Sequence, residues 1–180
     1  GSILVTPMQL AAGIAAIANR GLRVRPRLAF ALMSPQTREV RLYESPHLDP
    51  LPLQDAEHID TVINNLTDVV HGEGGTARGI GWNAPYKIAG KTGTAQVKGI
   101  GQDESYSERV VPEHLRDHAL FIAFAPADDP QIALAVVVEN GGPGGATAAP
   151  IARKLMDYYL QGKARPAIKV PVSQVTINPP

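Results

Sequence analysis

Two apolar runs, residues 119–125 and 132–139, constrain the fold of this chain more than any other feature of its sequence. Each has the length of a strand, and the segment between them, residues 126–130, holds two prolines and two aspartates, which favour a turn. Strands that read as continuous apolar runs belong to sheets that are covered on both faces. The two runs therefore predict paired strands in a sheet with packing partners on each side.

Three further segments have the patterns of helices. Thr6 precedes an apolar segment and forms a capping box with Gln9, which predicts a helix start. Asp55 is the expected N-cap of a second helix, whose apolar residues recur at three- and four-residue spacing until Gly72. A last helix is expected to open at Pro150, because proline favours the first helical position. Its inner face is predicted to carry Ile151, Leu155, Met156, Tyr159 and Leu160.

The remaining patterns complete an α+β fold. Residues 27–33 and 38–43 alternate in polarity around the polar segment 34–37 and predict a hairpin. Residues 86–97 predict a further strand. The order of helix, hairpin, helix, three strands and helix predicts an antiparallel sheet flanked by helices.

The composition bounds the size and the partners of this fold. With 180 residues, 44% of them hydrophobic, the chain can bury one core, so we expect a folded unit over residues 1–162. Residues 163–180 are expected to form a Pro-rich, poorly ordered tail. Seventeen basic and seventeen acidic side chains cancel, so no net field would attract nucleic acid. The absence of cysteine excludes disulfides and thiolate metal sites, and no cofactor is expected.

The strand predicted over residues 86–97 carries chemistry suited to anion recognition. Period-two geometry places Thr92 and Thr94 on one face of the strand and Lys91 on the other. A substrate carboxylate bound by the two hydroxyls, with Lys91 supplying positive potential, would use all three side chains. The alternative is an exposed edge strand whose lysine prevents pairing with a second edge.

Two glycines, Gly90 and Gly93, lie within this strand. Glycine in a strand interior often marks a point where another molecule approaches the backbone closely, and we predict such an approach here. The triplet Gly90-Lys91-Thr92 also suggests a phosphate-binding loop, but that motif requires a glycine where this chain has Pro85. A phosphate-binding loop is therefore excluded.

The histidines predict no metal site. His114 and His118 stand four residues apart beside Glu113, and two ligands with one neighbour do not make a zinc site. We expect both histidines to have structural roles. His71, near the end of the second predicted helix, is expected to interact with the free carbonyl groups there.

The segment Lys91-Thr92-Gly93-Thr94 on a strand resembles the third motif of the penicillin-binding and serine β-lactamase superfamily. Further segments match in order, namely Gly74-Gly75-Thr76-Ala77, Ala84-Pro85-Tyr86-Lys87-Ile88-Ala89, Leu115-Arg116-Asp117-His118, Phe124-Ala125-Pro126 and Glu139-Asn140-Gly141-Gly142. From about residue 3 to about residue 160, the ordered set resembles the C-terminal part of the transpeptidase domain of the penicillin-binding protein 2 family. These are class B, elongation-specific peptidoglycan D,D-transpeptidases.

The resemblance implies a β-lactamase/transpeptidase-like fold, present here as its C-terminal portion, and acyl transfer on peptides that end in D-alanyl-D-alanine. By resemblance, Lys91 and Thr94 take part in catalysis, and Thr92, Gly93 and Thr94 bind the substrate. The Thr94 backbone N–H would form half of the oxyanion hole. The resemblance also implies binding of peptidoglycan stem peptides and β-lactams, and a membrane glycosyltransferase as a partner. The implied location is the periplasmic face of the inner membrane, through an upstream anchor.

Two other motifs of the family, Ser-x-x-Lys and Ser-x-Asn, occur at none of the six serines. We therefore expect a chain that lacks the nucleophile, is inactive alone and needs the upstream half of its own domain as a partner. Apolar surface left uncovered by that half predicts self-association. The alternatives are a non-catalytic carboxylate-binding or scaffold module, and a β-lactamase or β-lactam sensor of the same superfamily.

Overall fold

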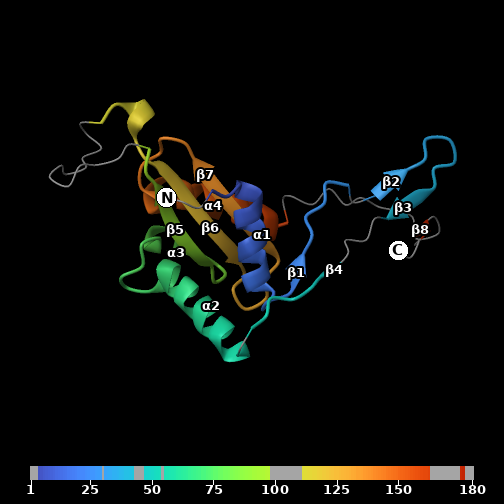
Figure 1. Cartoon of the computed structure of the whole chain (residues 1–180), viewed down its shortest axis with the longest axis horizontal. Coiled ribbons are helices and arrows are strands. Elements are labelled where there is room, and N and C mark those ends of the chain that lie inside the picture. Colours follow the sequence, from blue (N-terminus) through green and yellow to red (C-terminus); the bar gives the residue numbers. More distant parts are fainter. Residues whose placement is uncertain are drawn as a thin grey trace.

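A three-stranded antiparallel sheet forms the centre of the molecule. The computed structural model describes residues 4–29, 31–42, 47–53, 55–97, 111–162 and 175–176. The sheet has the order β5 (Ala89–Ala95), β6 (His118–Ala125) and β7 (Ile132–Val138), so β6 lies in the middle and β5 at an edge (Figure 1). The three predicted strands and their antiparallel pairing are confirmed.

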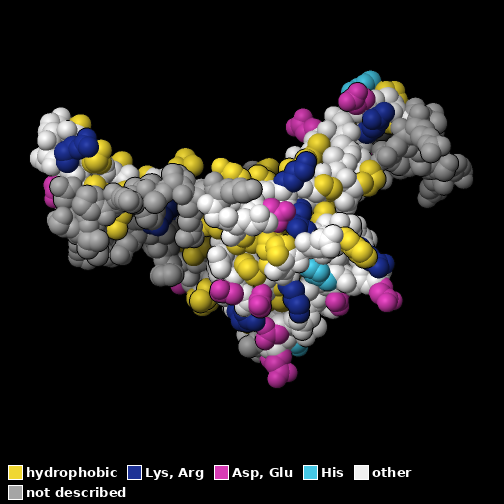
Figure 2. Space-filling view, turned by 180° about the vertical axis from the view of Figure 1, so that it is seen from behind, with side chains coloured by type: hydrophobic (Ala, Val, Ile, Leu, Met, Phe, Trp, Pro, Cys, Tyr) yellow, Lys and Arg dark blue, Asp and Glu magenta, His cyan; other side chains and the backbone are white. Residues whose placement is uncertain are grey.

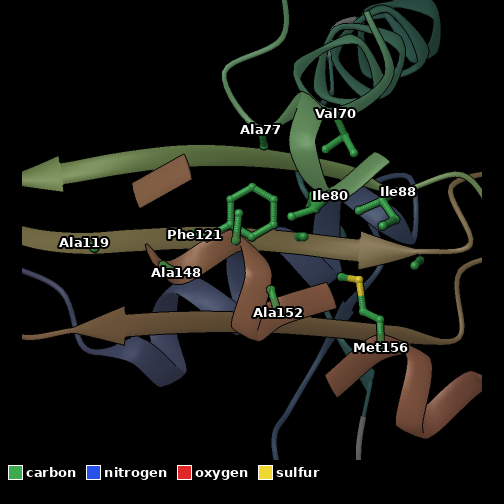
Figure 3. Close-up of a cluster of buried hydrophobic side chains, with 12 residues drawn as sticks. Val70, Ala77, Ile80, Ile88, Ala119, Phe121, Ala148, Ala152 and Met156 are labelled. Carbon is green, nitrogen blue, oxygen red and sulfur yellow. The ribbon is translucent and has the colours of Figure 1, made fainter. Parts of the chain in front are cut away.

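Helices cover both faces of this sheet, as the apolar strands predict. α1 (Pro7–Ala18) packs on one face and α4 (Gly144–Leu160) on the other (Figure 3). α2 (Ala56–His71) lies beside β5, and the short α3 (Arg78–Gly81) contacts both α2 and α4. Two buried clusters result, because successive residues of a strand point to opposite faces. The cluster under α4 includes Phe121, Ile88 and Met156, and the cluster under α1 includes Ile14 and Phe124.

Local hydrogen bonds set the starts of the first two long helices. The N–H of Gln9 donates to Thr6 Oγ1 at 3.2 Å and the N–H of Thr6 donates to Gln9 Oε1 at 2.8 Å, so the predicted capping box is confirmed. Asp55 caps α2 by accepting the N–H of Glu57 at 2.8 Å, and α2 ends at Gly72 as predicted. Side-chain oxygens satisfy N–H groups that the first helical turn leaves without a partner.

The predicted start of the last helix is wrong. α4 begins at Gly144, and Pro150 lies inside the helix rather than at its first position. Packing explains the difference, because a Cβ at Gly144 would overlap the carbonyl oxygens of Gly93 and Leu120. Glycine therefore allows the first turn of α4 to lie directly on the sheet, which its low helix propensity alone would not favour.

The inner face of α4 also differs from the prediction. Met156 is buried and Leu160 packs against the core as expected, but Ile151 and Leu155 are exposed. The other buried side chains on this face are small: Ala148, Ala149 and Ala152. A helix that lies this close to a sheet has room for alanine at its contact points and not for branched side chains.

A second group of short strands stands away from the main sheet (Figure 1). β2 (Ala31–Met33) and β3 (Val40–Leu42) form the predicted hairpin. β8 (Val175–Thr176) pairs in parallel with β3, so two residues of the segment expected to be a poorly ordered tail have a strand partner. The rest of residues 163–180 lies outside the described residues. In addition, β1 (Arg23–Val24) pairs with β4 (His47–Leu48).

Candidate active-site strand

β5 presents the Lys-Thr-Gly-Thr segment at the edge of the main sheet. Its strand neighbour is β6, and within the described residues no strand pairs with its outer side. The Lys91 and Thr94 side chains are exposed, and Thr92 and Gly93 are half-buried. The segment is therefore accessible to a ligand that approaches from the open edge.

The register of β5 places the two hydroxyls on one face. Thr92 lies opposite Phe121 and Thr94 lies opposite Ala119, and both partners belong to the core under α4. Residues directly opposite each other in an antiparallel pair share a face, so both threonines point to the α4 side. Lys91 points to the α1 side, and the predicted separation of faces is confirmed.

A third hydroxyl lies beside these two. Thr76 Oγ1 lies 2.9 Å from Thr92 Oγ1, within hydrogen-bond distance. Thr76 belongs to the segment between α2 and α3, where the N–H of Ala77 donates to the carbonyl of Val69 at 3.0 Å. A Cβ at Gly145 would overlap the Thr76 carbonyl oxygen, so α4 fixes this threonine from the other side. Three elements thus bring two threonine hydroxyls into contact.

The start of α4 contributes positive potential to the same place. Gly144 lies against the backbone of Gly93, and Gly145 lies near the Thr92 methyl group. The N–H groups of a helix start carry the positive end of the helix dipole, which favours a nearby anion. The helix start and the hydroxyls therefore favour the same kind of ligand.

The close approach predicted at the two strand glycines is made by the chain itself. A Cβ at Gly90 would overlap the ring of Phe121 and approach the Ile122 carbonyl oxygen. The backbone of Gly93 is covered on one face by Gly144 of α4. Gly90 therefore serves the packing of the sheet, whereas a Cβ at Gly93 would meet only the Leu120 Cβ, at 3.2 Å. The open side of the strand is its edge.

The Lys91 ammonium is held close to this edge. Its Nζ donates to the carbonyl oxygen of Thr92 at 2.8 Å, while the side chain as a whole stays exposed. An exposed ammonium adds positive potential without the cost of burying a charge. A cation, two hydroxyls and a helix start therefore surround the strand.

Three different elements hold the residues that lead into β5. The hydroxyl of Tyr86 donates to Asp157 Oδ1 of α4 at 2.6 Å. The carbonyl of Lys87 accepts the N–H of Ala127 at 2.9 Å, from the turn between β6 and β7. The N–H of Ile88 donates to His71 Nε2 of α2 at 2.9 Å. Tyr86, Lys87 and Ile88 thus have partners on three different elements, which positions the start of β5.

His71 therefore does not have the role that the sequence predicts. Its Nε2 accepts a hydrogen bond from the backbone N–H of Ile88, and within the described residues His71 makes no hydrogen bond to the carbonyl groups at the end of α2. An accepting Nε2 requires the neutral tautomer with the proton on Nδ1. Partial burial of the ring lowers the pKa of His71, and the positive charges of Lys87 and Arg153 lower it further, so the accepting form is favoured.

An ion pair supports the Tyr86 contact. Arg153 Nε donates to both carboxylate oxygens of Asp157 at 2.9 Å, and its Nη1 donates to the Ile80 carbonyl at 2.6 Å. Burial and the hydrogen bond to Asp157 raise the pKa of Tyr86. Burial alone would raise the pKa of Asp157, but the hydrogen bonds from Tyr86 and Arg153 lower it below its ordinary value. The network ties α3, α4 and the start of β5 together.

The far end of β5 is held by a buried carboxylate. Asp117 is 6% exposed, and its Oδ1 accepts the N–H of Val97 at 3.3 Å. Its carbonyl accepts the N–H of Gly142 at 2.9 Å. The backbone around the Lys-Thr-Gly-Thr segment is therefore positioned at both ends.

The two histidines expected to be structural have different surroundings. His118 Nδ1 accepts the N–H of Asn140 at 2.9 Å, and His114 is exposed in the short 3-10 helix η1 (Glu113–Leu115). Within the described parts of the chain, no group of three His, Asp or Glu residues could hold a metal ion.

An edge strand with two hydroxyls, an ammonium and a helix start beside it has the chemistry that favours a nearby anion. The family model described as the penicillin binding protein transpeptidase domain matches residues 1–157. The chain belongs to this family.

The similar proteins support the resemblance to penicillin-binding protein 2. The peptidoglycan D,D-transpeptidase MrdA of Acinetobacter baumannii is 38% identical over 183 residues, which cover 97% of this chain and 25% of that protein. The structure of Pseudomonas aeruginosa PBP2 in complex with WCK 5153 is similar at 39% identity and a TM-score of 0.71, over 96% of this chain and 34% of that chain. The resemblance and the transpeptidase-like fold are confirmed.

A second similar structure is an acyl-enzyme complex. The penicillin G acyl-enzyme complex of Mycobacterium tuberculosis penicillin-binding protein A has 31% identity and a TM-score of 0.67, over 89% of this chain and 33% of that chain. This chain spans about a quarter of the length of the curated relatives that it matches.

Proposed function

We propose that this chain forms one wall of the active site of a serine-type D,D-transpeptidase that cross-links peptidoglycan during cell elongation. The observation that carries the proposal is the open edge of β5, where Thr92 and Thr94 share a face next to the start of α4. Family membership supports the reaction type.

In this function the two threonine hydroxyls bind the terminal carboxylate of a D-alanyl-D-alanine peptide. Both point to the side on which the α4 start lies, so hydrogen bonds and the helix dipole act on the same anion. Thr76 can donate its proton to Thr92 Oγ1, which leaves the Thr92 proton free for the carboxylate. The Thr76 hydroxyl thus orients the Thr92 hydroxyl.

Lys91 and the Thr94 backbone act on the reacting carbonyl. The Thr94 N–H is proposed to donate to the oxyanion, and one such donor lowers the barrier by about 3 kcal/mol in other acyl-transfer enzymes. Lys91 supplies positive potential and takes part in proton transfer. Both groups belong to a strand whose two ends are held by hydrogen bonds, so they need little rearrangement during the reaction.

The nucleophile must come from another part of a longer protein. None of the six serines of this chain is followed by lysine at the third position, so we propose that the chain alone is inactive. The residue that attacks, and the Ser-x-Asn motif, would belong to the upstream half of the same domain. Among the described residues, no helix is both long and apolar enough to cross a lipid bilayer.

The partners follow from the same proposal. Stem peptides of peptidoglycan are the substrates, and β-lactams compete with them because they carry a similarly placed carboxylate. We place the site at the periplasmic face of the inner membrane, held by an upstream anchor, with a membrane glycosyltransferase supplying the glycan strands. The hydroxyls and the ammonium of β5 suit the carboxylate of a peptide terminus. Equal numbers of basic and acidic side chains leave no net field that would attract a nucleic acid.

Intact mass after incubation with penicillin G tests the proposal. The longer protein that contains this segment and a Ser-x-x-Lys motif should gain one penicillin, and the 180-residue chain should gain none. Thr92→Val together with Thr94→Val in the longer protein should slow the adduct about tenfold or more, since two hydrogen bonds to a charged group are lost. A longer protein that binds a D-alanyl-D-alanine peptide but forms no adduct would instead indicate a carboxylate-binding module.

A further inference from the structure

One hydrogen bond at the start of β5 is made by an ionisable side chain. The N–H of Ile88 donates to His71 Nε2 at 2.9 Å, and Ile88 is the residue directly before β5. The paired register of β5 and β6 begins at Ala89, so Ile88 lies outside the strand ladder. The Ile88 side chain is fully buried, which leaves its amide dependent on a partner within the protein.

His71 is exposed at the surface, and its Nδ1 side lies against α3. A Cβ at Gly81 of α3 would overlap the Val70 carbonyl oxygen and lie 3.2 Å from His71 Nδ1. Glycine at this position therefore lets α3 lie against the end of α2 and one side of the histidine ring. The contact between α2 and the start of β5 is thus part of the packing of the site.

We propose that His71 is a positioning residue for the Lys91–Thr94 segment, and that protonation of its imidazole releases the start of β5. Protonated imidazole carries N–H on both nitrogens and accepts no hydrogen bond. The Ile88 N–H would then face a second donor, and a buried donor without a partner is costly. Ile88 precedes Lys91 by three positions on the same chain, so its displacement reaches the site directly.

The positive charges near His71 disfavour protonation of its imidazole. Lys87, next to Ile88, and Arg153 of α4 disfavour the imidazolium, and Asp157 is held by Arg153 and Tyr86. α3 contributes Arg78, which donates to the Glu73 carbonyl. Burial and the two cations place the pKa of His71 below its ordinary value of 6.5. The contact is therefore intact above that value and is lost as the pH falls through the lowered pKa.

Amide NMR of the 180-residue chain tests the inference without any reaction. Between pH 8 and pH 5, the amides of Ile88 and of Lys91 to Thr94 should shift with the same midpoint as the His71 ring. His71→Gln keeps an acceptor that does not titrate, so these amides should stay fixed. The matched control is His58→Gln, which changes an exposed histidine near the start of the same helix. In this variant the amides should shift with pH as they do in the wild type. An Ile88 amide that ignores the His71 titration, or one that shifts equally in His71→Gln, overturns the inference.

A second measurement connects the contact with the proposed transpeptidase function, on which its catalytic meaning rests. In the longer protein, the rate of acylation by penicillin G is compared between the wild type and His71→Gln from pH 5 to pH 8. The ratio of the two rates should be near one at pH 8, and the variant should be about threefold to tenfold faster at pH 5, as expected for one hydrogen bond. A ratio that stays constant over this range contradicts a positioning role. Absence of acylation in both proteins would refute the proposed function, and the NMR result would still decide the role of His71.

Discussion

Thr76 Oγ1 and Thr92 Oγ1 lie 2.9 Å apart, although sixteen positions separate the two residues in the chain. The contact joins the segment after α2 to the open edge of β5. If Thr76 directs the Thr92 proton toward a bound carboxylate, Thr76→Val should slow acylation of the longer protein by penicillin G about threefold to tenfold. Valine keeps the shape of threonine, so the loss reports on the hydroxyl.

The control for this prediction changes the ligand as well as the protein. Penicillin G methyl ester has no free carboxylate, so Thr76→Val should change its acylation rate far less. Thr67→Val removes a hydroxyl that only donates to the Ile63 carbonyl within α2, and should leave both rates near the wild-type values. Equal slowing of the acid and the ester would contradict the proposed role of Thr76.

The contact of Gly144 with Gly93 predicts a stability effect. Gly144→Ala adds a Cβ that would overlap the carbonyl oxygens of Gly93 and Leu120, and neither backbone can move freely within the sheet. We expect the free energy of unfolding to fall by about 1–3 kcal/mol, the usual cost of overpacking. Urea unfolding of the 180-residue chain measures it.

Gly79→Ala is the matched control for Gly144→Ala. Gly79 lies in α3 with no atom within 4 Å of an added Cβ, and alanine has the higher helix propensity. This variant should be as stable as the wild type or slightly more stable. A wild-type stability for Gly144→Ala would mean that α4 does not rest on β5 as described.

The boundaries of α1 and α2 could be predicted from sequence because their signals are local. Thr6 with Gln9, and Asp55 with Glu57, satisfy N–H groups within one turn, so a short window contains the whole cause. The start of α4 could not be predicted, because it depends on a glycine that meets a strand more than fifty positions earlier in the chain. Packing at long range overrode both the proline signal and the low propensity of glycine.

The same division holds for the candidate site. The faces of Thr92 and Thr94 follow from the period of a strand, so they could be predicted from spacing. The partners of these residues could not, because the Thr76 contact and the His71 contact depend on how α2 lies beside β5. The segment Gly74-Gly75-Thr76-Ala77 is one of the ordered segments that carry the family resemblance, but its sequence does not indicate the contact between Thr76 and Thr92.

The hydrogen bond from Tyr86 to Asp157 predicts a pH-dependent contribution to stability. Tyr86→Phe should lower the free energy of unfolding by about 1 kcal/mol at pH 7, the usual net value of one hydrogen bond. The hydrogen bonds lower the pKa of Asp157 below its ordinary value of 3.8. The ionised carboxylate therefore stabilises the fold at pH values above 3.8. This contribution is lost as the pH falls from 3.8 through the lowered pKa of Asp157.

Urea unfolding between pH 3 and pH 7 measures this effect. The difference between Tyr86→Phe and the wild type should shrink toward pH 3, because protonated Asp157 no longer favours the Tyr86 hydroxyl as donor. Tyr158→Phe removes the hydroxyl of an exposed neighbour on α4 and should show no such trend. A difference that is independent of pH would contradict a charged partner for Tyr86.

The outer face of α4 predicts self-association of the chain. Ile151, Leu155 and Tyr158 are 41%, 49% and 56% exposed and follow one another at helical spacing, so they form one apolar stripe. Hydrophobic side chains also reach the surface of the main body in the view from the α4 side (Figure 2). Light scattering of the 180-residue chain should give an apparent mass that rises with concentration, since an apolar stripe of this kind favours contact with a second copy.

A charge placed in the stripe separates this cause from others. Leu155→Lys should lower the apparent mass toward that of the monomer at every concentration, because burying an unpaired ammonium in a contact is costly. Lys154→Glu changes the charge of the neighbouring exposed residue without adding or removing apolar surface, and should leave the concentration dependence in place. A wild-type chain that elutes as a monomer of constant mass would refute the association. A Leu155→Lys variant that associates as strongly as the wild type would instead assign the contact to another surface, such as the edge of β7, with which no other strand of the described residues pairs on its outer side.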